Sequence, residues 1–229
     1  NTPGLVPGPD FSKEALTNAA NPSGRVVMFS NHMFGLLYDA RREWREISRE
    51  PEETITQVYV KHALLLAMIP PFALFTGTTQ MGWSFAGQDL VFLSIGSAAA
   101  IAVAFYISLL LGLALMSFII HSLEHAFGTT TSYERCLLLT VYTATPMFLA
   151  GAAGFFPVFW FDAIVVGIAA MYSLHLLFTG VPVFMDIPES KGAMFSFMVM
   201  TAGMCMLGGG MAITVILWGL GMSPQYILS

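Results

Sequence analysis

Five long runs of apolar residues constrain the fold of this 229-residue chain more than any other feature. The runs cover residues 59–75, 91–120, 136–156, 159–178 and 194–218. A helix of about 20 apolar residues spans a hydrocarbon core roughly 30 Å thick. Only 10% of the residues are charged and 56% are hydrophobic, whereas an ordinary soluble domain has about 25% charged residues. The sequence therefore predicts an all-α, polytopic membrane protein with five transmembrane helices.

The composition outside the runs divides the chain into four expected segments. Residues 1–30 are rich in Pro, Gly, Asn and Ser, which predicts an extended or disordered N-terminal arm. Residues 31–53 predict a cytoplasmic amphipathic helix. Residues 54–222 contain the five-span domain, and residues 223–229 form a short tail on the opposite side of the membrane.

Apolar residues between 31 and 53 recur at intervals of three and four, which places them on one face of a helix. Trp44 lies on this apolar face, and Arg41, Arg42, Arg45 and Arg49 lie on the opposite face. Such a helix either lies in the membrane interface, where arginines reach lipid phosphates, or packs on its own protein. The sequence leaves both alternatives open. These five residues are our candidates for binding lipids or partner proteins.

The placement of the nine lysines and arginines predicts the orientation. Seven of them precede or open the first span, and Arg135 and Lys191 follow the second and fourth spans. All nine thus fall on one side of a five-span arrangement, and basic connections face the cytoplasm. We therefore expect a cytoplasmic N-terminus and a periplasmic C-terminus in a bacterial inner membrane. Expected partners are membrane lipids and other membrane proteins, a second copy included, and nothing indicates nucleic-acid binding.

Prolines and glycines near the spans predict where the helices bend or end. A proline inside a helix removes a backbone donor, and a glycine favours the left-handed conformation of a helix C-terminus. Residues 131–134 predict a capping box that starts the third membrane helix. The expected kinks and caps are Pro70, Pro71, Gly128, Pro146, Gly180 and Pro182.

Ionisable side chains within the spans are few and are candidates for a functional site. His121, Glu124 and His125 share one helical face at the end of the second span, and their order matches the H-x-x-E-H string of some zinc proteases. A catalytic zinc needs a third protein ligand, and no companion motif supplies one. Polar residues at a helix C-terminus are therefore the simpler interpretation, with metal or proton binding as the alternative. His175 in the fourth span leaves the same choice open.

Motifs of common enzymes are absent from the sequence. It has no phosphate-binding glycine loop, no nucleophile elbow and no C-x-x-C pair. Cys136 and Cys205 both lie inside apolar runs, where we interpret them as small hydrophobic residues. We therefore expect a protein that is not an enzyme and has no cofactor.

Three stretches in the order ARREWREISREP, FGTTTSYERCLLLTVYTATP and YSLHLLFTGVPVFMDIP resemble the Yip-domain family of five-span membrane proteins. They occupy residues 40–51, 127–146 and 172–188. The resemblance implies a five-span bundle with a cytoplasmic N-terminus. Eukaryotic members bind Rab-type GTPases in vesicle traffic, and bacterial members have no settled activity. Positions matching the shared pattern are Trp44, Ile47, Pro51, Gly128, Tyr142, Pro146, Tyr172, Gly180 and Pro182.

Three hypotheses for the function follow. The first is a non-enzymatic membrane scaffold or adaptor that binds partner proteins or lipids. The second is a small transporter or channel, in which kinks at Pro70, Pro71 and Pro146 open a path lined by His175, with His62 or Glu124 as further candidates. The third is an accessory subunit of a larger membrane complex.

Overall fold

The computed structural model describes residues 35–36, 39–49, 61, 63–83, 90–185, 187–221 and 223–228. The predicted arm of residues 1–30 and both ends of the predicted amphipathic helix lie outside these ranges. Five helices in the described part are long and apolar enough to cross a membrane. They are Ala63–Met81, Ile95–Phe127, Tyr133–Phe155, Phe159–Phe184 and Ser190–Gly219. The predicted all-α, five-span architecture is therefore confirmed.

The first span is interrupted near its prolines and then continues further than the sequence predicts. The helix breaks at a turn at Met68, and Pro70 and Pro71 occupy the first turn of α5 (Ile69–Thr76). Proline lacks a backbone N–H, but this loss costs little in the first turn of a helix, because the N–H groups there have no acceptor within the helix. A π-helix, η1 (Gly77–Met81), then extends the span beyond its predicted end. The predicted run ends at residue 75, before the segment GTTQM, and in this segment threonine hydroxyls donate to carbonyls one turn earlier.

The second and third spans meet in a tight connection. Helix α6 (Ile95–Phe127) continues through polar residues beyond the apolar run that ends at Ile120, and it stops at the predicted cap Gly128, whose φ is 81°. Helix α7 (Tyr133–Ala150) then begins after Ser132, whose hydroxyl accepts from the N–H of Arg135. The N-cap is thus Ser132 rather than the first residue of the predicted capping box, Thr131. A 3-10 turn, η2 (Gly151–Phe155), completes the third span.

Two residues expected to end the fourth span instead lie inside α8 (Phe159–Phe184). The prediction that Gly180 and Pro182 end this helix is therefore wrong. Pro182 lies close to the C-terminus of α8, where the loss of one backbone N–H does not prevent the last turn from forming. Gly180 has a packing role described below. Pro182 also faces Gly192 in α9 (Glu189–Gly219), since a Cβ on Gly192 would lie 2.8 Å from the proline Cγ.

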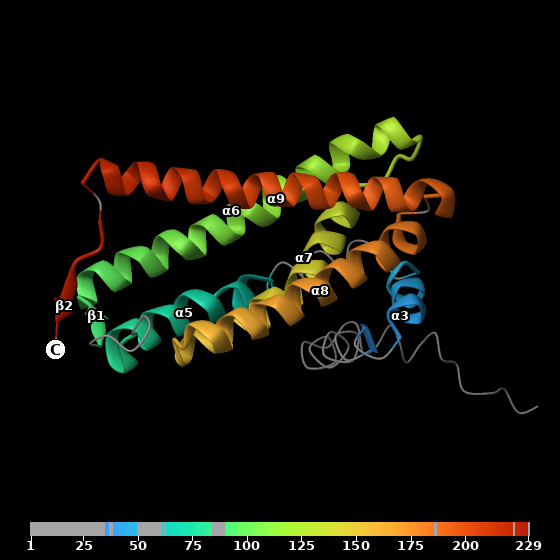
Figure 1. The fold of residues 1–229 in the computed structure, drawn as a ribbon. Coiled ribbons are helices and arrows are strands. Elements are labelled where there is room, and N and C mark those ends of the chain that lie inside the picture. Colours follow the sequence, from blue (N-terminus) through green and yellow to red (C-terminus); the bar gives the residue numbers. More distant parts are fainter. Residues whose placement is uncertain are drawn as a thin grey trace, which may run out of the picture.

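A small antiparallel sheet closes one end of the bundle. Strands β1 (Val91–Leu93) and β2 (Tyr226–Leu228) pair so that Val91 lies opposite Leu228. Trp83 extends this pairing through two backbone hydrogen bonds with Val91, of 3.0 and 2.9 Å. The sequence predicts only a short tail at residues 223–229 and a helix that starts at Val91. Residues 226–228 thus join the sheet rather than trailing from α9 (Figure 1).

The helices differ strongly in how much of their surface the protein covers. Within the most apolar stretch of each span, 50% of the third span is buried but only 6% of the fifth. Helix α7 is therefore the central helix, with contacts to α5, α6 and α8, and α9 lies at the periphery against α6 and α8 (Figure 1).

The amphipathic helix α3 (Ala40–Ile47) packs against the bundle at the end opposite the sheet (Figure 1). Asp39 caps it by accepting from the N–H of Arg42 at 3.1 Å. Trp44 and Ile47 are completely covered, and the Trp44 ring lies 5.5 Å from Tyr142 in α7 and 5.3 Å from Phe184 in α8. Of the two alternatives for this helix, the structure favours packing on its own protein, because its apolar face is not available to lipid.

Gly180 makes this packing possible. A Cβ at this position would lie only 2.7 Å from Cε2 of Trp44 and 3.0 Å from its Nε1. The indole therefore rests directly on the backbone of α8. The missing side chain serves a close contact between two helices, and not the predicted helix end.

Candidate functional site

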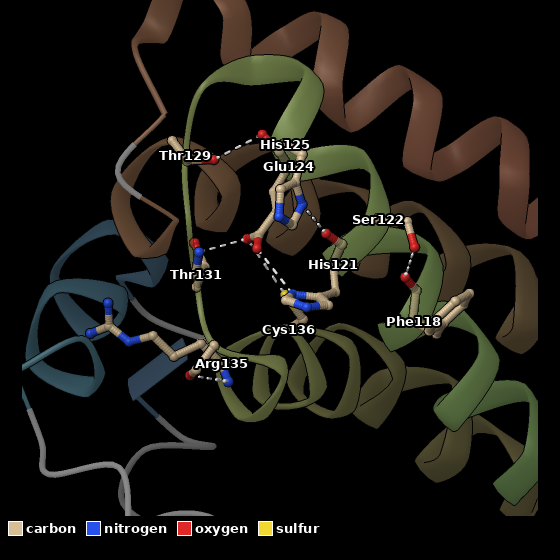
Figure 2. A network of polar contacts seen from close by, with 10 residues as sticks. Phe118, His121, Ser122, Glu124, His125, Thr129, Thr131, Arg135 and Cys136 are labelled. Carbon is tan, nitrogen blue, oxygen red and sulfur yellow. Dashed lines mark hydrogen bonds and ion pairs between the residues drawn. The ribbon is translucent and has the colours of Figure 1, made fainter.

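A buried carboxylate lies where α6 turns into α7. Glu124 is in the last turn of α6, and its side chain is fully buried. The left-handed backbone at Gly128 reverses the chain, so that residues 129–132 run back past the end of α6. This reversal brings the first turn of α7 beside Glu124 (Figure 2). Burying a carboxylate is costly unless it is paired or hydrogen-bonded, so its neighbours decide what it does.

Three groups surround the two carboxylate oxygens of Glu124. The backbone N–H of Thr131 donates to Oε2 at 3.0 Å, and the Cys136 thiol lies 3.9 Å from the same oxygen. The other oxygen, Oε1, lies 3.0 Å from Nδ1 of His121 (Figure 2). Both Nδ1 and Oε1 are buried without a hydrogen-bond partner, because their separation suits a hydrogen bond but their alignment does not.

His121, Glu124 and Cys136 together form a possible ligand set for a metal ion. Each offers one ligand atom, and these atoms all lie within 4.8 Å of one another. Glu124 and Cys136 are fully buried, and the His121 side chain is 35% exposed. The set combines thiolate, imidazole and carboxylate, which are the three ligand types that zinc accepts in proteins.

The structure brings together only two of the four ionisable residues that the sequence singles out. His125 turns its Nδ1 toward the carbonyl of His121, at 3.2 Å, and its ring packs edge-on against the His121 ring. His175 lies far along the chain on α8, with an exposed side chain whose ring is 5.9 Å from that of Tyr172. Neither belongs to the cluster around Glu124.

Sequence reasoning missed Cys136 as a member of this cluster. It lies 12 residues after Glu124 and inside an apolar run, so its position predicts a small hydrophobic residue. The signal that points to it is indirect. A glycine stop at residue 128 and a serine cap at residue 132 make the connection short, which places the first turn of the next helix beside the last turn of the previous one.

The residues proposed for lipid or partner binding separate into a buried and an exposed group. Trp44 is fully buried, so it belongs to the core and cannot form part of a contact surface. The other members remain exposed, namely Arg41, Arg42, Arg45 and Arg49. Arg42 pairs with Glu46 at 3.1 Å, and Nε of Arg45 donates to the carbonyl of Arg41 at 3.2 Å.

Arg135 connects α3 to the carboxylate cluster. Its guanidinium donates to the carbonyl of Ser48, the C-cap residue of α3, at 2.7 Å. The same group lies over the Phe184 ring, 5.3 Å from its centroid. Since Arg135 adjoins Cys136, the end of α3 and the start of α7 are held together beside the buried carboxylate.

A cavity of about 370 Å³ lies between α7 and α8 and is lined almost entirely by apolar residues. Pro146 lies inside α7 and forms part of the lining, together with Tyr142 and Tyr172. His175 does not line it. The cavity therefore lacks the intramembrane histidine that the transporter hypothesis places along its path.

Comparison with known proteins identifies the family. The profile of the Yip1 domain matches residues 34–210. The inner membrane protein YohC of Escherichia coli K12 is 38% identical over 191 residues, which cover 83% of this chain and 97% of that protein. YohC of E. coli O6:H1 matches equally well, and no solved structure is significantly similar. The resemblance found in the sequence is therefore confirmed, and this integral membrane protein belongs to the Yip1 domain family.

Proposed function

We propose that this chain is a non-enzymatic scaffold of the bacterial inner membrane, which binds anionic lipids or acidic partner proteins through the arginine face of α3. The related E. coli proteins are named as inner membrane proteins, which supports the location. The observation that carries the proposal is the anchoring of α3. Its apolar face is buried in the bundle, so its arginines are held in fixed positions at the bundle's end.

The arrangement of charges on α3 supports binding to an anionic surface. Arg41 and Arg45 are spaced by four and lie along one side of the helix, and Arg49 follows just beyond the C-cap Ser48. Acidic residues are grouped beside these arginines, and one of them, Glu46, is already paired with Arg42. Each arginine near an anionic membrane surface contributes about 1 kcal/mol, so three contribute about 3 kcal/mol, or roughly a hundredfold in affinity.

The proposed orientation places α3 in the cytoplasm and the chain end in the periplasm. Arg135 contacts the C-cap of α3, and Lys191 lies in the first turn of α9 at the same end of the bundle (Figure 1). The sheet containing β2 lies at the other end. Basic residues favour the cytoplasmic side, which supports this assignment.

Cysteine labelling in intact cells tests this orientation. Cysteines placed at the exposed positions Glu134 and Ser223, in a Cys205→Ser background, should respond oppositely to a membrane-impermeant reagent. We expect Ser223→Cys to be labelled without lysis and Glu134→Cys only after lysis. Labelling of both positions without lysis, or the reverse pattern, contradicts the proposed orientation.

A charge-matched set of variants tests the contact itself. The full-length protein is purified in mild detergent, and its bound lipids and copurifying proteins are identified by mass spectrometry. Replacing Arg41, Arg45 and Arg49 by Gln should remove the bound anionic lipid or acidic protein, whereas replacing them by Lys should retain most of it. Arg42→Gln is the control, because Arg42 is already paired with Glu46. An unchanged set of ligands in the triple Gln variant contradicts the proposal.

The accessory-subunit hypothesis remains a second candidate, because the exposure of α9 favours it. Gly208, Gly209 and Gly210 have nothing within 4 Å of an added Cβ, so no described part of the chain packs on them. In the third span, by contrast, Gly151 packs directly on Pro70 of α5. Mass measurement of the native complex and of the triple Gln variant distinguishes the two hypotheses, since a stoichiometric partner chain that the variant retains supports the subunit and one that it loses supports the scaffold.

A further inference from the structure

The cluster around Glu124 is poorly explained as a set of hydrogen bonds. Glu124 is fully buried, and within the described part of the chain the hydrogen-bond donors to its oxygens are one backbone N–H and one distant thiol. Its second oxygen and the facing Nδ1 of His121 both lack a hydrogen-bond partner. Buried polar atoms without a hydrogen bond are rare in folded proteins and need an explanation, and an ion bound beside them is one.

We propose that His121, Glu124 and Cys136 bind a divalent transition-metal ion, and that zinc is the ion that fits best. A zinc ion lies about 2.0–2.2 Å from nitrogen and oxygen ligands and about 2.3 Å from sulfur, so ligand atoms around it are roughly 3.4–3.6 Å apart. The measured separations are 3.0 Å from Nδ1 to Oε1 and 3.9 Å from Sγ to Oε2. These two distances are to different oxygens of the carboxylate, and the three ligand atoms all lie within 4.8 Å of one another, so side-chain shifts of up to about 1 Å bring them to coordinating distances.

Charge balance favours a dication at this position. A thiolate and a carboxylate carry two negative charges, and zinc neutralises both, so the loaded site is neutral and compatible with its burial. On binding, the thiol releases its proton to solvent and the sulfur becomes a ligand. The nearest arginine does not replace the metal, because the Arg135 side chain points away from the cluster, toward the end of α3 (Figure 2).

The second shell and the access route also suit a metal site. The N–H of Thr131 orients the carboxylate, as hydrogen bonds to metal-binding carboxylates do in other proteins. The side chain of His121 is 35% exposed, so an ion reaches the site from the end of the bundle. Because the described residues offer three ligands, a water molecule completes the coordination.

A metal here would fix the junction of α6 and α7. The three ligands come from the last turns of α6 and the first turn of α7. Arg135, next to Cys136, extends this clamp to the C-cap of α3. The site does not depend on what the arginine face of α3 binds.

Cobalt substitution tests the proposal, because a thiolate bound to Co²⁺ gives a charge-transfer band in the near ultraviolet. The full-length protein is purified without a polyhistidine tag, stripped with a chelator and titrated with Co²⁺. The chain has two cysteines, so in Cys205→Ser the only thiol is Cys136. We expect this variant to bind one Co²⁺ per chain and to show the thiolate band, which added Zn²⁺ then removes by displacement.

Two further variants test the carboxylate ligand and provide a control from the neighbouring turn. Glu124→Gln keeps the shape of the side chain but removes its charge, and it should weaken Co²⁺ binding roughly a hundredfold or more, since even second-shell changes cost 10–100-fold. His125→Ala is the matched control from the neighbouring turn, and it should bind as the parent does. Zn²⁺ should also raise the melting temperature of the parent protein but not that of Glu124→Gln.

Three results would overturn the proposal. The first is the absence of a thiolate band in Cys205→Ser, which decides the question even if Glu124→Gln does not fold. The second is equal Co²⁺ affinity in Glu124→Gln and the parent. The third is a loss of binding in His125→Ala as large as that in Glu124→Gln, because the ligand set would then be different.

Discussion

Replacing Gly180 by Ala puts two opposing effects in direct competition. In most helices this change is favourable, because alanine loses less backbone entropy than glycine and gains about 0.5–1 kcal/mol. Here the added methyl group would lie 2.7 Å from Cε2 and 2.9 Å from Cζ2 of Trp44. Contacts below 3.0 Å require one of the two groups to move.

Trp44 has little room to move. It is fully buried, with the Tyr142 ring 5.5 Å away and the Phe184 ring 5.3 Å away. Extra atoms in a well-packed core typically cost about 1–3 kcal/mol. Subtracting the gain in helix propensity leaves a net loss of about 1–2 kcal/mol in the free energy of unfolding for Gly180→Ala.

Gly167→Ala in the same helix is the matched control. Nothing lies within 4 Å of a Cβ at this position, so the change adds only the propensity gain. The difference between the two variants therefore isolates the steric cost, which we expect to be about 1–3 kcal/mol. The free energy of unfolding of each variant is measured by reversible unfolding in mixed micelles with a rising fraction of denaturing detergent, and circular dichroism monitors the unfolding.

A double-mutant cycle with Trp44→Phe checks the identity of the clashing group. Phenylalanine lacks the indole atoms nearest to position 180, so Gly180→Ala should cost less in this background, with a coupling of about 1 kcal/mol or more. If Gly180→Ala is as stable as Gly167→Ala, or if the coupling is near zero, the direct contact of Trp44 with α8 does not limit stability and the reasoning is refuted.

Three further changes probe the helix ends and the α3 attachment in the same unfolding assay. Gly128→Ala should cost about 1–2 kcal/mol because φ is 81° there, whereas Gly96→Ala, with a helical backbone and open space, should not destabilise the protein. Ser132→Ala removes the N-cap of α7 and should cost about 1 kcal/mol. Tyr172→Phe removes the hydroxyl that donates to the carbonyl of Leu36 and should also cost about 1 kcal/mol. Wild-type stability in any of the three would show that the corresponding contact contributes little.

The sequence by itself determined the membrane architecture and the family. Lipid offers no hydrogen-bond partners, so a chain with five apolar runs must satisfy its backbone within helices. Local signals also marked the helix end at Gly128, because that position needs a left-handed backbone. The end of α8 was misplaced, since Gly180 and Pro182 suit a helix end and a helix packing site equally well.

Tertiary structure alone decided which residues meet. In a soluble helix a polar face marks the side turned to water, but in a membrane the lipid-facing and protein-facing sides are both apolar. The runs therefore did not reveal that α7 is central and α9 peripheral, nor that Cys136 lies beside Glu124. For α3, periodicity identified an apolar face containing Trp44. The apolar face is covered by α8, which Trp44 can approach because Gly180 has no side chain. Gly180 lies 136 residues after Trp44, and contacts over such distances in the sequence arise only when the helices pack together.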